Sequence, residues 1–270
     1  MANRFKSRTI YTVLLLSCIV VFWLFDNFFT PDTYSLPKEE IVYNSFPKEL
    51  LPTSLTHEIV EHSFYTLSYN EPFEQAEWVA YVLDPSHLTY EDRKRPYFIE
   101  DPYVSTKSAD WRNYKGSGYD RGHLVPAGDR RFSEQAYNET FYTSNISPQN
   151  REFNAGIWND LEQQTRRWAK KYGRLYVFTG GILTKGLQEI GEEDVDVPDY
   201  FYKIIVRKTD AELNAIAFVI PNSPQTKPLP KFVTSIDDIE SKTGLDFFYK
   251  LSEKEQADFE SVKTTSGWKF

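Results

Sequence analysis

Cysteine and histidine are scarce in this chain, and their scarcity excludes several kinds of site. The single cysteine, Cys18, lies within an apolar N-terminal run, so no intramolecular disulfide can form and no cysteine-based zinc site exists. The four histidines are scattered and lack the spacing of paired metal ligands. The fold must therefore be stabilised by packing, for which a hydrophobic content of 40% is ample.

Positive charge is also in deficit. The chain has 31 Lys and Arg residues against 39 Asp and Glu residues, a net charge of −8 and a pI near 5.2. This balance excludes binding of nucleic acid through overall positive charge, so any site for a polyanion must be local. Internal repeats and low-complexity blocks are absent from the sequence.

One long uncharged run is present, from Thr9 to Phe25, after three basic residues and before Asp26. Its length is at the short end of what crosses a bilayer, and no A-x-A cleavage site follows. We therefore interpret residues 1–30 as an uncleaved signal anchor, a single transmembrane helix. Because the basic residues precede the run, the positive-inside rule places the rest of the chain outside the cytoplasm, on the periplasmic side.

Two other interpretations of this N-terminal segment stay open. It could be a signal peptide that is cleaved and releases a secreted protein, or a lipoprotein signal in which Cys18 of "LLSC" carries the lipid. The following "IVVFWLF" disfavours the second, since a lipidated cysteine is normally followed by a polar linker. Residues 31–61 contain four prolines among polar residues and are predicted to be a linker, which leaves residues 62–270 as the main domain.

Aromatic and β-branched content predicts strands within residues 63–70, 77–84, 174–181, 199–208 and 213–222. Residues 154–173 predict a helix that ends at Gly173, and residues 235–262 predict two short helices around Gly244. Strands and helices do not alternate regularly. A mixed α+β fold is therefore favoured over a doubly wound parallel sheet.

The stretch "YDRGHLVPAGDRRFS", residues 119–133, places a histidine among arginines. A neutral imidazole can take a proton from water near neutral pH, and guanidinium groups such as those of Arg121 and Arg130 match phosphate. From Lys107 to Arg131 six basic side chains stand against three acidic ones, a local footprint for a polyanion. By itself the pattern also fits a structural histidine in a solvated loop.

A second group of polar residues lies on the predicted helix. Asn154, Glu162 and Arg166 follow an i, i+4 ladder with Trp158, so each step advances only ~40° around the helix. An amide oxygen suits Mg²⁺, which wants few protein ligands. Asn154 could hold the cation, Glu162 could orient its waters and Arg166 could contact phosphate. On spacing alone, an ordinary amphipathic helix with a Glu162–Arg166 ion pair is favoured.

Together, "SGYDRGHLVPAGDRRFS" and "TFYTSNISPQNREFNAGIWNDLE" resemble the DNA/RNA non-specific endonucleases, a family that includes secreted bacterial nucleases and mitochondrial endonuclease G. The resemblance extends to "EWVAYVL", "FIEDP", "VFTGG", "VPDYFYKIIV" and "IESKTGLDFF" and covers roughly residues 62 to 255. It implies a ββα-metal (His-Me finger) endonuclease fold, with a mixed, largely antiparallel sheet and flanking helices.

The resemblance also implies roles for single residues. His123 matches the general base, and Asn154 matches the protein ligand of the catalytic Mg²⁺, for which Mn²⁺ is a plausible substitute. Arg121 matches the motif arginine, and Asn145 matches an asparagine that supports the histidine region. Glu162 and Arg166 match a residue near the metal-bound waters and a residue near the phosphate, and Arg95 matches a further substrate arginine with its spacing off by one.

The implied activity is hydrolysis of DNA and RNA to 5′-phosphorylated products, with His123 activating water. Contacts to backbone phosphate read no base edges, so little sequence preference is expected. The family further suggests a homodimer and an inhibitor protein, while the membrane contact depends on residues 1–30. Two alternative functions stay open: a phosphodiesterase on a non-nucleic envelope phosphoester, and a catalytically silent module that binds nucleic acid.

Overall fold

The computed structural model describes residues 2–29, 33–34, 46–208 and 213–270. The chain divides into two compact units, Met1–Thr33 and Tyr34–Phe270. The first consists of the helix α1 (Ala2–Phe28), which contains an apolar window from Arg8 to Phe25 with a mean hydropathy of 2.0 and no buried residue. By length and composition this helix can cross a membrane, as either an anchor or a signal sequence would.

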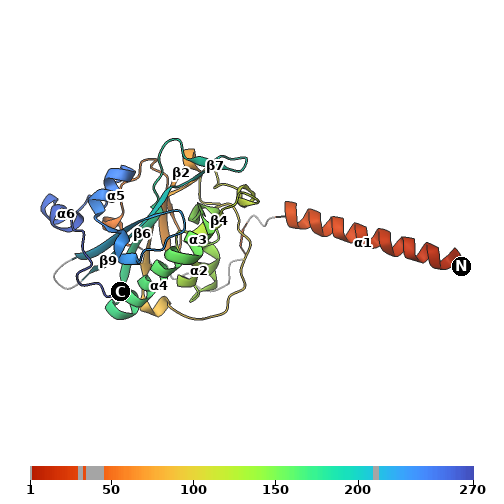
Figure 1. The fold of residues 1–270 in the computed structure, drawn as a ribbon, viewed down its shortest axis with the longest axis horizontal. Coiled ribbons are helices and arrows are strands. Elements are labelled where there is room, and N and C mark those ends of the chain that lie inside the picture. The colour runs from red at the N-terminus through yellow and green to blue at the C-terminus, as the bar shows by residue number, and fades with distance from the viewer. Residues whose placement is uncertain (1, 30–32, 35–45, 209–212) are drawn as a thin grey trace. The chain divides into compact units, whose positions relative to one another are not determined.

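The second unit is built on a seven-stranded sheet in which every neighbouring pair is antiparallel (Figure 1). The strand order is β1-β2-β3-β6-β9-β10-β11. The strands are β1 (Ile59–Glu61), β2 (Tyr65–Asn70), β3 (Gln75–Leu83), β6 (Leu175–Gly181), β9 (Tyr200–Lys208), β10 (Leu213–Pro221) and β11 (Val233–Thr234).

Helices cover both faces of this sheet, and α3 and α4 lie on the side opposite α5 and α6 (Figure 1). Because successive side chains of a strand point to opposite faces, β3 supplies Val79 and Tyr81 to one core and Trp78 to the other. In the first core Trp168 of α4 (Asn159–Tyr172) packs on the sheet, and in the second Ile239 of α5 (Ile236–Thr243) does so. The central strands are buried on both sides as a result.

Shorter elements surround the sheet. Two hairpins are formed by β4 (Asp120–His123) with β5 (Ile146–Gln149) and by β7 (Gln188–Ile190) with β8 (Val195–Val197). The remaining helices are α2 (Glu134–Glu139), α3 (Arg151–Phe153), the π-helix η7 (Asn154–Trp158) and α6 (Glu253–Glu260). Single 3-10 turns are η1 (Lys48–Leu50), η2 (Glu71–Phe73), η3 (Pro85–His87), η4 (Trp111–Tyr114), η5 (Ala127–Asp129), η6 (Thr143–Asn145) and η8 (Leu229–Phe232).

The sequence-based fold prediction is confirmed: the fold is α+β, all five predicted strands form in the sheet, and Gly173 ends α4. The linker prediction needs correction. Residues 30–32 and 35–45 lie outside the described residues, but residues 46–61 belong to the folded domain. There Phe46 and Leu50 are buried in the core, and β1 pairs with β2. The surrounding prolines and charged residues had indicated a linker instead of a folded segment.

Candidate active site

The β4–β5 hairpin carries the "DRGH" residues and places the side chains of Arg121 and His123 on the same face. In the antiparallel register Arg121 lies opposite Pro148 and His123 opposite Ile146. Because the side-chain period of a strand is two, Arg121 and His123 share one face. Gly122 between them has no room for a side chain, since an added Cβ would lie 2.1 Å from Cδ of Gln149. The glycine therefore lets Gln149 close the other face of the hairpin.

The imidazole of His123 is enclosed by two aromatic rings. Its centroid lies 5.6 Å from that of Phe98 and 4.9 Å from that of Phe141. Nε2 is shielded from solvent and has no hydrogen-bond partner among the described residues. Burial lowers the pKa of His123 to about 3, and the cations of Arg95 and Arg121 add to the effect. The ring is thus neutral near pH 7, the form a proton acceptor needs.

Arg95 and Arg121 come together although 26 positions separate them in the sequence. Their guanidinium carbons lie 5.2 and 4.8 Å from the centroid of the Phe98 ring. Neither forms an ion pair with any residue that the structure describes. Two adjacent cations without a carboxylate partner repel each other, and burial together with Arg95 lowers the pKa of Arg121. An anionic phosphate group would relieve this repulsion.

Asn154 is the residue suited to hold a metal. It opens the π-helix η7, where the non-helical backbone of Gly156 interrupts the regular pattern. Its Nδ2 donates a hydrogen bond of 3.1 Å to Oδ2 of Asp120. Because a carboxylate only accepts, the amide nitrogen is committed to Asp120 and the amide oxygen Oδ1 stays available for a hard cation. The donor set therefore fits a divalent metal.

Asp120 was missed in the assignment of roles from the sequence. It is the acid of the "DRGH" motif itself, and its position directly before Arg121 was the available signal. The contact to Asn154 spans 34 residues and depends on how η7 packs against the hairpin. The hydrogen bond to Asp120 fixes the orientation of the Asn154 amide.

Glu162 and Arg166 form the ion pair that their i, i+4 spacing predicted, with Arg166 Nη2 lying 3.3 Å from Glu162 Oε2. Nε of Arg166 also pairs with the buried carboxylate of Asp129. Burial raises the pKa of Glu162 to about 7, although the cations of Arg166 and Lys203 oppose the rise. Lys203 is itself fully buried over the ring of Trp158 at 4.7 Å. The half-buried Glu162 and Arg166 of α4 thus form one charge cluster with the buried Asp129 of η5 and Lys203 of β9.

Two predicted site residues have structural surroundings instead. Arg130, expected to bind substrate, is only 1% exposed and donates to the carbonyl oxygens of Phe64 and Val82 at 3.3 and 3.1 Å. Its guanidinium lies over the ring of Tyr81, so the substrate-binding assignment is wrong.

Asn145 is also fully buried. Its Oδ1 accepts from the backbone nitrogen of Val125 at 2.8 Å, and its Nδ2 donates to the carbonyl oxygens of Val125 and Thr140. It therefore fixes the turn that follows His123, which is a supporting position and not one that takes part in the reaction.

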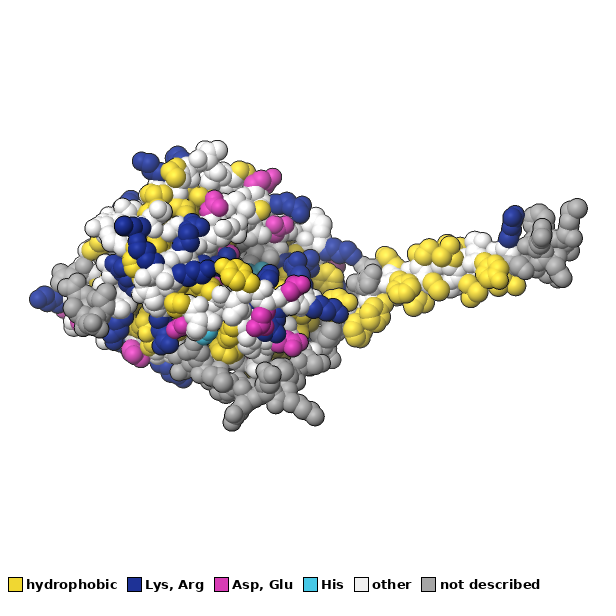
Figure 2. Space-filling model, turned by 90° about the horizontal axis from the view of Figure 1, so that it is seen from below, with side chains coloured by type: hydrophobic (Ala, Val, Ile, Leu, Met, Phe, Trp, Pro, Cys, Tyr) yellow, Lys and Arg dark blue, Asp and Glu magenta, His cyan; other side chains and the backbone are white. Residues whose placement is uncertain are grey.

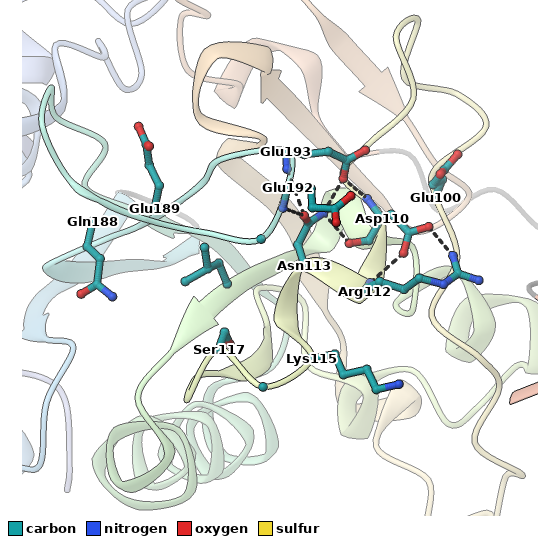
Figure 3. A pocket seen from close by; sticks show the side chains of 13 residues that line it. Glu100, Asp110, Arg112, Asn113, Lys115, Ser117, Gln188, Glu189, Glu192 and Glu193 are labelled. Atoms are coloured by element: carbon teal, nitrogen blue, oxygen red, sulfur yellow. Dashed lines mark hydrogen bonds and ion pairs between the residues drawn. The ribbon is translucent and has the colours of Figure 1, made fainter. Parts of the chain in front are cut away.

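The surface charge agrees with this arrangement. On the face of the domain seen in Figure 2, many Lys and Arg side chains are exposed, with Asp and Glu side chains interspersed among them. A separate pocket of about 760 Å³ lies between η4 and the β7–β8 hairpin (Figure 3). Carboxylates dominate its lining, and Asn113 joins its two sides by accepting from the backbone nitrogens of Glu192 and Glu193 at 2.8 and 3.1 Å. Those carboxylates repel phosphate, so a polyanion should contact the arginines and avoid this pocket.

Comparison with known proteins identifies the family to which this sequence is similar. From residue 43 to residue 254 the sequence matches the DNA/RNA non-specific endonuclease family. It is 39% identical over 222 residues to mitochondrial nuclease EXOG of Danio rerio, a match that covers 75% of this chain and 65% of that protein. It is 34% identical over 239 residues to mitochondrial endonuclease G of Caenorhabditis elegans, covering 78% of each chain.

The fold also matches a solved relative. A chain of the crystal structure of the EndoG/EndoGI complex aligns with a TM-score of 0.68 at 32% identity, covering 73% of this chain and 88% of that one. The sequence match, the fold and the "DRGH" hairpin with its neighbouring asparagine lead to one conclusion: this chain belongs to the DNA/RNA non-specific endonuclease family of metal-dependent hydrolases.

Proposed function

We propose that this protein is a Mg²⁺-dependent endonuclease that hydrolyses phosphodiester bonds of both DNA and RNA and leaves 5′-phosphorylated ends. The observation that carries the proposal is the enclosed ring of His123 on the "DRGH" hairpin, with Arg121 of the same strand and Arg95 of an earlier loop, neither of which forms an ion pair with a described residue, over the neighbouring Phe98 ring. A bound divalent cation, with Mn²⁺ as a substitute for Mg²⁺, would stabilise negative charge on the phosphate. Asn154 would hold it through Oδ1, kept available by Asp120.

His123 is the general base in this proposal. Since Nε2 is enclosed, exchange of a proton with water must use the other ring nitrogen, Nδ1. The neutral ring keeps its proton on Nε2 and accepts one from the attacking water at Nδ1. Phe98 and Phe141 hold the ring in place and exclude other waters. The hydroxide formed in this way attacks phosphorus, and the bond from phosphorus to the 3′-oxygen breaks. The 3′-oxygen leaves and takes up a proton, and the phosphate stays on the 5′-oxygen of the other fragment.

Substrate breadth follows from which parts of the nucleic acid these residues can reach. Arg95 and Arg121 are suited to phosphate oxygens, which DNA and RNA share. Water rather than a 2′-hydroxyl is the nucleophile, so the reaction can proceed with either ribose or deoxyribose in the substrate. Glu162 and Arg166 would support the site from α4, with Arg166 near the phosphate and Glu162 near water held by the metal. We expect cleavage with little sequence preference.

The proposal is tested by nicking of supercoiled plasmid with the full-length protein in detergent. Wild type should cleave with Mg²⁺ and not with EDTA, and His123→Ala should lose about 10²- to 10⁴-fold in rate, the range that general-base catalysis typically contributes. His57→Asn is the matched control, because His57 is exposed and its positive φ of 63° suits asparagine. A folded wild-type protein that cleaves neither DNA nor RNA with any divalent metal would refute the proposal.

We further propose that α1 anchors the protein in a membrane with the nuclease domain outside the cytoplasm. The apolar window from Arg8 to Phe25 and the basic residues before it support this orientation. Retention in the membrane after alkaline carbonate extraction, with the domain digestible by protease added to the non-cytoplasmic side, is the expected result. Release by carbonate would indicate cleavage of the segment instead.

Two partners are proposed as well. The solved relative comes from the crystal structure of an EndoG/EndoGI complex that concerns inhibition of EndoG, so an inhibitor protein is proposed for this chain too. A homodimer is proposed from the family resemblance. Light scattering of the purified protein, with the detergent contribution subtracted, distinguishes a dimer from a monomer.

A further inference from the structure

Three carboxylates meet on the side of the sheet opposite α4. Asp237 and Glu240 lie on α5, and Glu260 is the last residue of α6. One oxygen from each lies within 4.8 Å of the others. Asp237 and Glu240 are three residues apart on one helix and so share a face, which places both toward the end of α6. Like charges at this separation repel unless a proton or a cation lies between them.

Glu260 is the unusual member of the group. Its side chain is 5% exposed, and its Oε1 is enclosed with no hydrogen-bond partner among the described residues. Burial raises the pKa of Glu260 to about 8, and the carboxylates of Glu240, Asp237 and Asp246 add to the rise. A buried carboxylate without a partner is costly, so the arrangement calls for a compensating group.

Among the described residues no lysine or arginine forms an ion pair with these three carboxylates, although Lys263 is near enough to lower the pKa of Asp238 on the same helix. Lys242 pairs with Asp238, on the same helix but outside the cluster. Lys250 donates to the backbone carbonyl of Lys48 at 3.1 Å. Glu240 has one neutral donor, the backbone nitrogen of Phe247 at 2.7 Å from its Oε1. The three negative charges are therefore not balanced by a lysine or arginine ion pair within the described residues.

We propose that Asp237, Glu240 and Glu260 form a second metal site, structural and separate from Asn154, that binds a divalent cation of the Ca²⁺ type. Carboxylate oxygens are the ligands that Ca²⁺ prefers, and it accepts irregular sets of six to eight oxygens. Mg²⁺ demands a stricter octahedron and gives up its waters reluctantly, so it fits less well. Asp237 is exposed, which leaves room for waters to complete the coordination.

Such a cation would fasten the C-terminal helix to the domain. α5 is held to the sheet by Ile236 and Ile239, which are buried in the core. α6 contributes Phe259, whose ring lies 5.1 Å from that of Phe248, and few other apolar contacts. A metal shared by both helices would join α6 to the better-packed α5. Because α4 and its charge cluster lie on the opposite face, we expect an effect on stability and none on the nuclease chemistry.

The test is thermal unfolding of the full-length protein in detergent, stripped of metal and titrated with CaCl₂. At a hundredfold excess over the dissociation constant the melting temperature should rise by about 5 to 10 °C. Glu260→Gln should abolish this rise. Glu253→Gln, which removes an exposed acid at the start of α6, should retain it. Asn154→Ala should also retain it, because the catalytic metal site is a different one.

Asp237→Asn is a second variant for the case that Glu260→Gln does not fold, and it should weaken the Ca²⁺ response at least tenfold in concentration. A wild-type melting temperature that ignores Ca²⁺ would overturn the proposal. A Ca²⁺ response that persists in both Glu260→Gln and Asp237→Asn would also overturn it. So would a Ca²⁺ response that is lost in Asn154→Ala and in no other variant. A melting temperature that rises on acidification and never with cation would show that a shared proton compensates the cluster.

Discussion

Replacing Asp120 with alanine should separate metal binding from proton transfer. The carboxylate accepts a single hydrogen bond of 3.1 Å from Nδ2 of Asn154, and both residues are half-buried. A hydrogen bond to a charged group contributes about 1.5–3 kcal/mol, and we take about 2 kcal/mol for this partly exposed one. At 1.4 kcal/mol per factor of ten, the Mg²⁺ concentration for half-maximal activity should rise roughly 30-fold, within the range of about 10- to 100-fold found for such supporting partners.

The assay is the initial rate of plasmid nicking across a Mg²⁺ series. In Asp120→Ala the rate should return to within about threefold of wild type at saturating Mg²⁺, because Asn154 still carries its amide oxygen and only loses its orientation. His123→Ala should stay inactive at every Mg²⁺ concentration. Asp160→Ala removes the same charge from an exposed position of α4 and should leave the Mg²⁺ requirement unchanged.

Two results would refute this reasoning. One is an unchanged Mg²⁺ requirement in Asp120→Ala, which would mean that the hydrogen bond does not orient Asn154. The other is a rate that saturating Mg²⁺ does not restore in a variant that melts like wild type, which would place Asp120 in the chemical step itself.

Three further predictions concern single side chains. Arg95→Gln should raise KM and lower the slope of log KM against log salt by about one, as loss of one phosphate contact predicts, while Lys94→Gln should change the slope less. Arg130→Met should lower the free energy of unfolding in urea by about 2–6 kcal/mol without raising KM, because it leaves two buried carbonyls without their donor at about 1–3 kcal/mol each. Burial lowers the pKa of His87 to about 4 in the folded chain, so between about pH 6.5 and pH 4 the unfolded chain binds a proton that the folded chain does not bind. The free energy of unfolding should therefore fall as the pH drops from about 6.5 to 4. In His87→Gln this fall, followed by urea unfolding at each pH, should be smaller by roughly 2 kcal/mol, and an equal fall would disprove the assignment.

Local patterns in the sequence predicted much of the fold. The strands β2, β3, β6, β9 and β10 are runs of aromatic and β-branched residues, and α4 carries its helical ladder and its terminal glycine within one stretch. Such signals depend on side-chain periods of two or 3.6 residues, so neighbours in the chain are sufficient. The "DRGH" stretch and the asparagine 31 residues beyond His123 were likewise recognisable as a motif.

Side-chain direction and long-range pairing were decided only by the tertiary structure. Nothing in "GDRRFS" distinguishes Arg130, which is buried against Tyr81, from the neighbouring Arg131. The meeting of Arg95 with Arg121 and the bond from Asn154 to Asp120 join segments far apart in the chain. Burial, pKa and the available lone pair of an amide depend on what packs against a residue from elsewhere, and that information does not exist in a local window of sequence.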